Sequence, residues 1–420
     1  MNVWYFHHYA TPKEIAGLHR PFELGRYIRK DNKIAVFSAS YLHYSGDHMI
    51  EGKEKYLYKV YDGVETVFVK TCGYESKIKR VLNMVQFGWG LFGAAKRFSK
   101  EQWKPEIIVA SSPHPLTMLA GLRIAKKYKI PCVCEVRDFW PEVFFMGGVL
   151  KENSLLGRVL LRGERYIYEK ADAIVFLKEG DHTYITDHKW DMGHGGKIDM
   201  AKCFYINNGV DIEQFDRQAA DNVYVDSELD REGRFKAVYC GTVRPVNNLG
   251  MLLDAAKLTK DVDFFVFGTG NCVEDLKKRI TEENITNVFL KGYVDNMYIP
   301  SILSKASVTV LNYSGTAYNW SRGNSSNKLF EYLASGKPTV STVKMGYDII
   351  ERYDCGVSVE ETTAENISAA ILAMKELSEE AYKEKCANAR KASLNFDVPN
   401  LARVYMDVLK TTKSEHIGKR

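Results

Sequence analysis

The hydrophobic positions of this chain fall into short apolar runs separated by longer segments with helical periodicity. Each run is bounded by polar, glycine or proline residues, as expected for buried strands. The runs lie at 3–6, 34–39, 107–110, 131–136, 173–177, 203–206, 237–239, 264–267, 288–290 and 308–311. Strands that alternate with helices in this way predict parallel sheets with helices on both faces.

This alternation is interrupted once and then restarts. Residues 217–233 are polar and acidic and show no periodicity, so we interpret them as a linker between domains. The chain is therefore predicted to be an α/β protein with two doubly wound, Rossmann-like domains, at residues 1–216 and 234–396. A length of 420 residues also favours two cores over one.

One stretch in the second half, residues 323–340, combines several signals of a ligand site. Polar residues at 324–326 suit the start of a helix, whose free N–H groups bind phosphate. Lys328 lies in the first turn, and Glu331 projects from the same face one turn later. A lysine on a diphosphate and a glutamate on ribose hydroxyls would together hold a nucleotide. A surface helix with a solvated Lys–Glu pair explains the same residues equally well.

The first half carries polar residues where its predicted strands end. His7 and His8 follow the first strand, and the segment E-V-R-D-F-W-P-E at 135–142 follows another. Open α/β sheets bind ligands at the carboxyl ends of their strands, so both places are candidate sites. The alternatives are that the histidines are solvated loop residues and that Arg137 simply pairs with Asp138.

Charge is distributed unevenly, with a net of +8 over residues 1–205 and −3 over residues 206–420. A basic first half favours an anionic partner, either a phospholipid surface or a phosphorylated substrate. Nucleic acid is not expected, because no known reading motif is present. The uncharged stretch 81–95 is flanked by basic residues but is shorter than the ~20 apolar residues that cross a bilayer. It predicts a helix that either lies in a membrane interface or packs on the sheet.

The cysteines and the first residues bear on location. Eight cysteines are scattered without the spacing of a zinc site, which predicts reduced thiols in a cytoplasmic protein. Residues 1–6 fit a first strand and lack the basic and long apolar regions of a signal peptide. No carboxylate cluster with the spacing of a Mg²⁺ or Mn²⁺ site is evident, so no metal is expected.

Five motifs occur in an order that makes a family resemblance specific. They are N-N-G-V-D at 207–211, Y-C-G-T-V-R at 239–244, F-G-T-G at 267–270, K-G-Y-V at 291–294 and N-K-L-F-E-Y-L-A-S-G-K-P at 327–338. Together they resemble the family-four retaining glycosyltransferases of the GT-B fold. S-S-P-H-P at 111–115 and the segment at 135–142 look like the branch that builds bacterial surface polysaccharides.

The resemblance implies two Rossmann-like domains that face a cleft and a closing helix at 397–412 that crosses back to the first domain. It implies a nucleotide-sugar donor, of which UDP-sugars are the expected class, on the second domain. The acceptor, a lipid-linked or soluble saccharide, would lie on the first. Transfer would retain the anomeric configuration and need neither a metal nor another cofactor. Peripheral binding to the inner face of the cytoplasmic membrane is left open.

The resemblance also assigns roles to residues. Arg244 and Lys328 would stabilise the leaving diphosphate, and either Asp138 or the donor phosphate would accept the proton. Donor-binding candidates are Glu331, Gly241, Thr242, Gly268, Gly270, Tyr293, Val294, Asn324, Ser325, Ser326 and Asn327. Acceptor-binding candidates are His7, His8, Arg137, Trp140, Glu142 and Asn208.

The sequence departs from the family pattern at three positions. Gly323 stands where the first glutamate of the E-x7-E motif is usual, so recognition of the donor sugar must differ. Asn247 replaces the usual lysine after the G-T-V turn, and Arg137 replaces the usual histidine before an aspartate. Two rival functions therefore stay open, a nucleotide-sugar epimerase of the same fold and a non-catalytic subunit that binds a nucleotide sugar.

Overall fold

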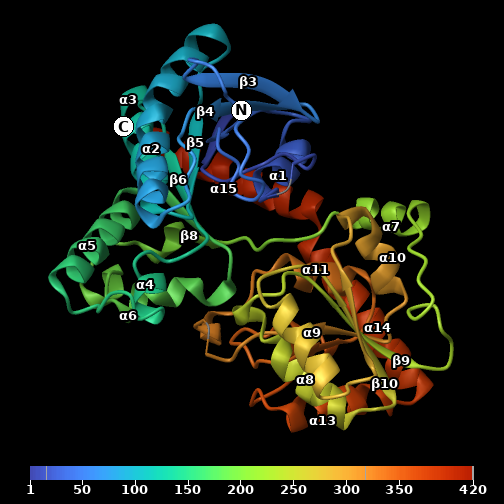
Figure 1. Ribbon diagram of the computed structural model, residues 1–420. Coiled ribbons are helices and arrows are strands. Elements are labelled where there is room, and N and C mark those ends of the chain that lie inside the picture. The colour runs from blue at the N-terminus through green and yellow to red at the C-terminus, as the bar shows by residue number, and fades with distance from the viewer. Residues whose placement is uncertain (16, 317, 419–420) are drawn as a thin grey trace. The chain divides into compact units, whose positions relative to one another are not determined.

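The computed structural model describes residues 1–15, 17–316 and 318–418 (Figure 1). The chain divides into two compact units. Unit 1 comprises Met1–Asn207 together with the chain from Pro399 onwards, and unit 2 comprises Asn208–Val398. Each unit contains one twisted sheet with helices on both faces, so the prediction of two Rossmann-like α/β domains is confirmed.

Unit 1 is built on an eight-stranded sheet in the order β3-β4-β2-β1-β5-β6-β7-β8. The strands are β1 (Asn2–His7), β2 (Lys33–Ala39), β3 (Tyr56–Tyr61), β4 (Val64–Val69), β5 (Ile107–Ser111), β6 (Cys132–Val136), β7 (Ala173–Phe176) and β8 (Cys203–Tyr205). All neighbours pair in parallel except β3 and β4. The strand order reverses between β1 and β5, which makes the carboxyl ends of these two strands the expected ligand-binding edge.

The two faces of this sheet are covered by different helices. The helices are α1 (Arg20–Ile28), α2 (Lys77–Glu101), α3 (Pro115–Tyr128), α4 (Glu142–Met146), α5 (Leu155–Lys170), α6 (Thr183–Asp187) and α15 (Val398–Gly418). One core joins α2, α3 and α5 to the sheet, and a second core on the other face joins α1 and α15. Ser76 and Ser154 cap α2 and α5 by accepting backbone N–H groups of Lys79 and Gly157.

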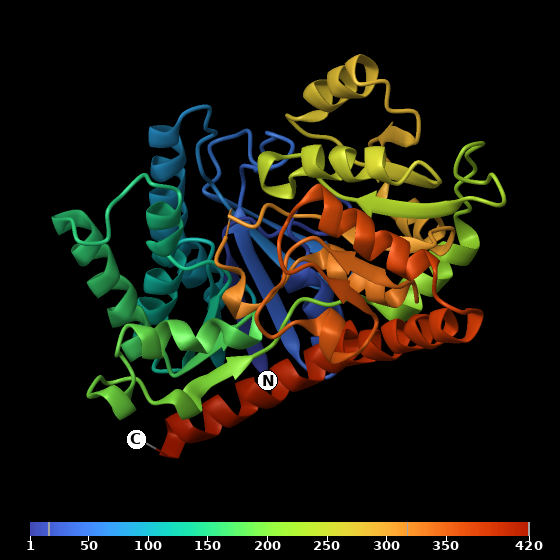
Figure 2. The same cartoon turned by 90° about the horizontal axis from the view of Figure 1, so that it is seen from below.

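The closing helix α15 packs on unit 1 (Figure 2). Tyr405 is fully buried in the core and donates a hydrogen bond to Glu135 at 3.3 Å. Near the end of the helix, Lys413 pairs with Glu106, and His416 contacts Asp172 at 2.8 Å. These contacts attach the last helix to loops on the amino-terminal side of the sheet.

The hairpin of β3 and β4 was not predicted from the apolar runs. β3 lies at the edge of the sheet, all of its residues are partly or fully exposed, and Lys59 interrupts its apolar side chains. The turn between the strands is Asp62-Gly63, and both residues have positive φ angles, 45° and 75°. An Asp-Gly pair between two β-rich segments is a strong hairpin signal and would have revealed it.

Unit 2 contains a six-stranded parallel sheet in the order β11-β10-β9-β12-β13-β14. The strands are β9 (Phe235–Cys240), β10 (Val262–Phe267), β11 (Val288–Gly292), β12 (Val308–Leu311), β13 (Thr339–Ser341) and β14 (Gly356–Ser358). The helices are α7 (Ile212–Asp221), α8 (Leu249–Leu258), α9 (Val273–Glu282), α10 (Ile299–Ser304), α11 (Asn327–Ala334), α12 (Ile349–Arg352), α13 (Ala364–Lys375) and α14 (Glu379–Ser393). α8, α9 and α13 share one core on one face (Figure 1), and α7, α10, α11 and α14 share another. The order reverses between β9 and β12.

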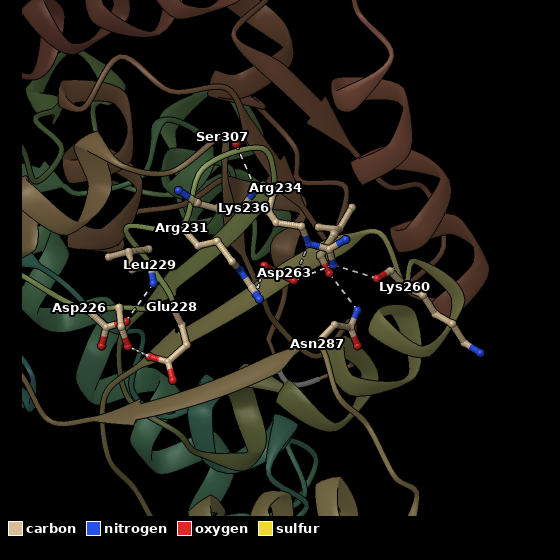
Figure 3. A network of polar contacts seen from close by, with 12 residues as sticks. Asp226, Glu228, Leu229, Arg231, Arg234, Lys236, Lys260, Asp263, Asn287 and Ser307 are labelled. Carbon is tan, nitrogen blue, oxygen red and sulfur yellow. Dashed lines mark hydrogen bonds and ion pairs between the residues drawn. The ribbon is translucent and has the colours of Figure 1, made fainter.

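The predicted linker at 217–233 is not a free connection in the structure. Helix α7 runs into it, and Leu229 is fully buried in the unit 2 core. Arg231 and Arg234 pair with the same carboxylate, Asp263, at 2.8 and 2.7 Å (Figure 3). The segment is acidic because several of its carboxylates pair with cations of unit 2. Asp226, for example, pairs with Lys291 at 2.7 Å. The division between units lies at Asn207 instead.

Candidate functional site

The loops that follow β9 and β10 are joined to each other at the carboxyl edge of the unit 2 sheet. Gly241 N–H donates to the Phe267 carbonyl and Val243 N–H to the Thr269 carbonyl, both at 2.9 Å. A Cβ on Gly268 would lie 1.8 Å from the Gly241 carbonyl oxygen. One on Gly270 would lie 2.0 Å from the oxygen of Val243. The two glycines of F-G-T-G are therefore required for close backbone approach.

Helix α11 begins beside these loops, after the strand β12 that adjoins β9. Ser326 N–H donates to Asn324 Oδ1 at 2.9 Å, and Asn208 Nδ2 donates to the Ser325 carbonyl at 2.7 Å. Leu329 and Leu333 anchor the opposite face of the helix in the core. The first N–H groups of a helix have no intrahelical partner. Asn324 and Asn208, both candidates from the sequence, hold the backbone at this helix start. Asn208 was expected in the first domain, but it belongs to unit 2.

Lys328 is surrounded by aromatic rings. Its Nζ donates to Tyr239 Oη at 3.2 Å and lies 4.8 and 4.6 Å from the ring centroids of Tyr239 and Tyr313. Burial lowers the pKa of this amine to about 7. Glu331 follows one turn later and is half-buried. The solvated surface pair considered above is therefore not what the structure contains.

Gly323 has a backbone reason for replacing glutamate. Its φ of 96° and ψ of −164° lie in a region that is essentially restricted to glycine. A Cβ there would also lie 3.2 Å from the Gly346 carbonyl oxygen. Gly323 and Gly346 both donate to the Trp320 carbonyl, at 3.1 and 2.9 Å. This loop is built around glycine, so a family-type glutamate does not fit its conformation.

The remaining donor-binding candidates lie on the same edge of the sheet, and most of them are more exposed to solvent. Arg244 and Thr242 are exposed on the turn after β9. Tyr293 is 71% exposed on the turn after β11, whereas Val294 is partly buried against the core. This third turn is attached to the second, because Gly268 N–H donates to the Gly292 carbonyl at 2.6 Å.

In unit 1, His7 and His8 are buried at the end of β1, so they are not solvated loop residues. His8 Nδ1 lies 2.5 Å from Nε2 of His114, which follows β5, and its ring stacks on Phe87 with a centroid distance of 4.6 Å. Burial lowers the pKa of both His7 and His114 to about 3, so these rings are neutral near pH 7. They form a neutral aromatic and hydrogen-bonding edge where the strand order reverses.

Arg137 and Asp138 follow β6 on this edge. Ser112 Oγ accepts both of their backbone N–H groups, at 2.8 and 3.4 Å. Nη1 of Arg137 is buried and has no hydrogen-bond partner among the described residues. Its charge contributes to the lowered pKa of His7. This unpartnered nitrogen suits an anionic or hydroxyl ligand better than a structural role.

Glu135 belongs to the candidate segment 135–142, but no role of its own was predicted for it from the sequence. Glu135 is completely buried and accepts hydrogen bonds from Tyr5 at 2.6 Å, Ser111 at 2.7 Å and Arg20 at 3.0 Å. Burial raises the pKa of Glu135, but the charges of Arg20 and Arg137 and these hydrogen bonds bring it down to about 2. The only sequence signal was a glutamate inside an apolar strand, C-V-C-E-V, which a buried cation must balance.

Trp140 is positioned by a second buried carboxyl, Glu164, for which the sequence predicted no role. Glu164 of α5 accepts the Trp140 N–H at 3.1 Å and the Tyr184 hydroxyl at 2.6 Å. Burial raises the pKa of Glu164 to about 8. The Trp140 ring packs edge-to-face on Phe144 at 4.7 Å, and Glu142 begins α4.

The uncharged stretch 81–95 lies within α2 and packs on the sheet, which is one of the two predicted alternatives; contact with a membrane interface stays a prediction. Phe87 and Leu91 are fully buried against the sheet, whereas Trp89 is 75% exposed. An apolar groove of about 290 Å³ lies between α2 and α3, with Trp89, Phe92 and Arg123 in its lining. Among the described residues, no helix is both long and apolar enough to cross a membrane.

Two family models match the chain. Residues 234–376 match the model "Glycosyl transferases group 1", and residues 56–194 match the "Glycosyl transferase 4-like domain". Two separate stretches of the chain thus resemble domains of glycosyltransferases. The donor-binding candidates from Gly241 to Glu331 lie in the first match, whereas the second includes Arg137–Glu142 but begins after His7 and His8. Both matched models are transferase domains, which favours transfer over epimerisation.

A curated bacterial protein also resembles part of this chain. A Bacillus subtilis (strain 168) protein named "Putative teichuronic acid biosynthesis glycosyltransferase TuaH" is 26% identical over 238 residues. That match covers 55% of this chain and 55% of the relative, so the chain spans about half the length of the curated relative it matches.

Solved structures cover nearly the whole chain. Anabaena Alr3699/HepE in complex with UDP has a TM-score of 0.69 at 13% identity, covering 98% of this chain and all of its own. An E. coli structure, "Trehalose-6-phosphate … bound with UDP-2-fluoro glucose", has a TM-score of 0.70 at 11% identity, covering 98% and 99%. The chain therefore has the GT-B fold.

Proposed function

We propose that this chain transfers a sugar from a UDP-sugar to a saccharide acceptor. The observation that carries the proposal is the arrangement of Lys328 and Glu331 at the start of α11, where the unit 2 strand order reverses. An ammonium and free helix N–H groups match a diphosphate, and a carboxylate one turn on matches ribose hydroxyls. UDP or UDP-glucose in the HepE structures supports this ligand class.

In this proposal, unit 2 stabilises the leaving group. Lys328, the N–H groups at 325–327 and the exposed guanidinium of Arg244 would surround the diphosphate as its negative charge develops. Electrostatic stabilisation of this kind is usually the largest catalytic contribution and requires no metal. The donor sugar would contact backbone amides at 324–327, because Gly323 offers no side chain.

The acceptor would bind at the unit 1 edge formed by His7, Arg137 and Trp140, with Glu142 and His8 beside them. The unpartnered Arg137 nitrogen and the neutral histidines supply hydrogen bonds to hydroxyls. The acceptor hydroxyl would attack the face from which the diphosphate leaves, so that configuration is retained. Its proton would pass to Asp138 or to the donor phosphate.

The biological setting in the proposal is assembly of a surface polysaccharide at the cytoplasmic face of the membrane. The name of the Bacillus relative supports the pathway class. Support for the membrane surface comes from α2, on which Ile78, Val81, Leu82 and Trp89 are exposed between basic residues. Exposed apolar side chains flanked by lysine and arginine are typical of interfacial helices.

A donor screen with and without acceptors tests the function. The protein is incubated with a panel of UDP-sugars and with lipid-linked or free oligosaccharides. Release of UDP that requires the acceptor, with a product of unchanged anomeric configuration by NMR, is the expected result. An isomerised UDP-sugar without any acceptor would support an epimerase instead. Binding without turnover would support a non-catalytic subunit.

A further inference from the structure

The Lys328 amine is held by neutral groups that leave one of its N–H bonds available. Tyr239 Oη donates its own proton to the Thr242 carbonyl at 2.7 Å, so its oxygen is oriented to accept from Nζ. The Tyr313 ring covers Nζ at 4.6 Å. A lysine ammonium has three donors, and such aromatic faces favour a cation without neutralising it.

Asn247 is the second acceptor for this amine. In the amide orientation that satisfies both ends of its side chain, its oxygen accepts from Lys328 Nζ at 3.0 Å while its nitrogen donates to the Thr242 carbonyl at 2.7 Å. The side chain is buried, and the Asn247 backbone carbonyl is fixed by Asn312 Nδ2 at 2.5 Å. Asn247 therefore has one orientation relative to the amine.

The titratable groups that face Lys328 come from three elements. Tyr239 and Cys240 lie on β9, Tyr313 follows β12, and Glu331 lies one turn away on α11. Among the described residues, no carboxylate forms an ion pair with Lys328. Burial lowers its pKa to about 7, and Cys240 and Glu331 only partly oppose this effect. The groups around the Lys328 amine thus fix its position but supply no negative charge to pair with it.

We propose that Asn247 is a positioning residue, which together with Tyr239 and Tyr313 holds the Lys328 amine for a nucleoside diphosphate, and that this amine takes up a proton when the diphosphate binds. The inference rests on the proposed function, since it concerns the same donor site. The incoming phosphates supply the counter-charge, and the third N–H of the ammonium donates to them.

The sign of the pH dependence follows from this arrangement. Below pH 7 the free amine is already charged, so binding takes up no proton. Above pH 7 the free amine is increasingly neutral, whereas the bound one stays charged because the diphosphate raises its pKa. Affinity should therefore fall as pH rises above 7, by up to about tenfold per pH unit until the pKa of the bound amine is reached.

Isothermal titration calorimetry with UDP-glucose from pH 6 to pH 9 tests this, using buffers with different ionisation enthalpies. UDP-glucose is the suitable probe because its phosphates carry no group that titrates near neutral pH. We expect almost no proton uptake at pH 6, about one proton per site by pH 8, and the predicted loss of affinity.

Three variants separate positioning from folding. In Asn247→Asp, a carboxylate beside the amine raises the pKa of Lys328, so the loss of affinity should move to higher pH. In Lys328→Arg, the guanidinium stays charged, so proton uptake should disappear. Lys277→Met, at an exposed pair with Glu274, should leave the profile unchanged. Melting curves identify any variant that fails to fold.

The outcomes distinguish this inference from the function on which it rests. Binding of UDP-glucose with an affinity and proton count that do not change with pH would overturn the inference alone. An Asn247→Asp profile that coincides with that of the wild type would overturn the role of Asn247. Absence of UDP-glucose binding at every pH would overturn the donor assignment, and this inference with it.

Discussion

Replacing Gly323 with alanine tests whether the loop before α11 is built around glycine. The φ of 96° and ψ of −164° at this position are not available to a residue with a Cβ without strain. The new methyl group would also lie 3.2 Å from the carbonyl oxygen of Gly346, a residue whose own N–H donates to the Trp320 carbonyl at 2.9 Å. The loop must either carry the strain or move.

The size of the effect depends on whether the loop keeps the strain or moves. A residue held in a sparsely populated backbone region costs of order 1–3 kcal/mol of folding free energy. In a unit of this size each kcal/mol lowers the melting temperature by about 2–4 °C. If the loop moves instead, the start of α11 moves with it and binding becomes weaker. UDP-glucose affinity falls about tenfold for every 1.4 kcal/mol of binding free energy that is lost.

Differential scanning calorimetry and UDP-glucose titration measure the two routes on the same samples. Gly163→Ala is the matched control, because the same methyl group is added within helix α5 with nothing within 4 Å of it. The control should be neutral or stabilising, since alanine favours helix over glycine. Gly323→Glu should lower the melting temperature or the UDP-glucose affinity at least as much as Gly323→Ala does, because the backbone strain is the same.

A Gly323→Ala protein with the melting temperature and UDP-glucose affinity of the wild type would refute the reasoning. The backbone at 323 would then accept a side chain. The absence of the family glutamate would have no conformational cause.

Three further predictions concern catalysis and location. Lys328→Ala should lower turnover by about 10²-fold or more at saturating donor with the fold intact, since it removes one stabiliser of developing charge; turnover like that of the wild type would exclude the role. Activity should survive EDTA, and a complete loss restored by Mn²⁺ would show that the mechanism is different. The protein should co-sediment with anionic vesicles at low salt, less so at high salt, and far less after Lys96, Arg97 and Lys100 are changed to glutamate, with UDP-glucose affinity unchanged. Wild-type protein that stays in the supernatant would point to a soluble acceptor.

The parts of the structure that depend on local patterns were predictable. The apolar runs located ten of the parallel strands, though not β4, β13 or β14, and helix-start chemistry located Lys328 and Glu331 on α11. Both signals act over one or two turns, or within one strand, so a single segment contains all the information. The carboxyl edge of the unit 1 sheet followed in the same way from His7 and His8 after β1.

The parts that depend on distant partners were not predictable. Arg20 and Glu135 are 115 positions apart, and nothing in either segment specifies the other. The segment 217–233 looked like a linker because its carboxylates, among them Asp226, neutralise cations such as Lys291 that lie much later in the chain. The conformation of Gly323 depends on Gly346, which follows only after α11 and β13.

The attachment of α15 to unit 1 has a consequence for synthesis of the chain on the ribosome. Unit 2 is one continuous segment, Asn208–Val398, whereas unit 1 is completed only when the residues after Pro399 have emerged. Until then, the sheet face that Leu401, Tyr405 and Leu409 later cover is exposed to water. The nascent protein therefore carries an uncovered apolar face while its entire second half is synthesised. During this period a chaperone that binds apolar surfaces would protect the chain from aggregation most.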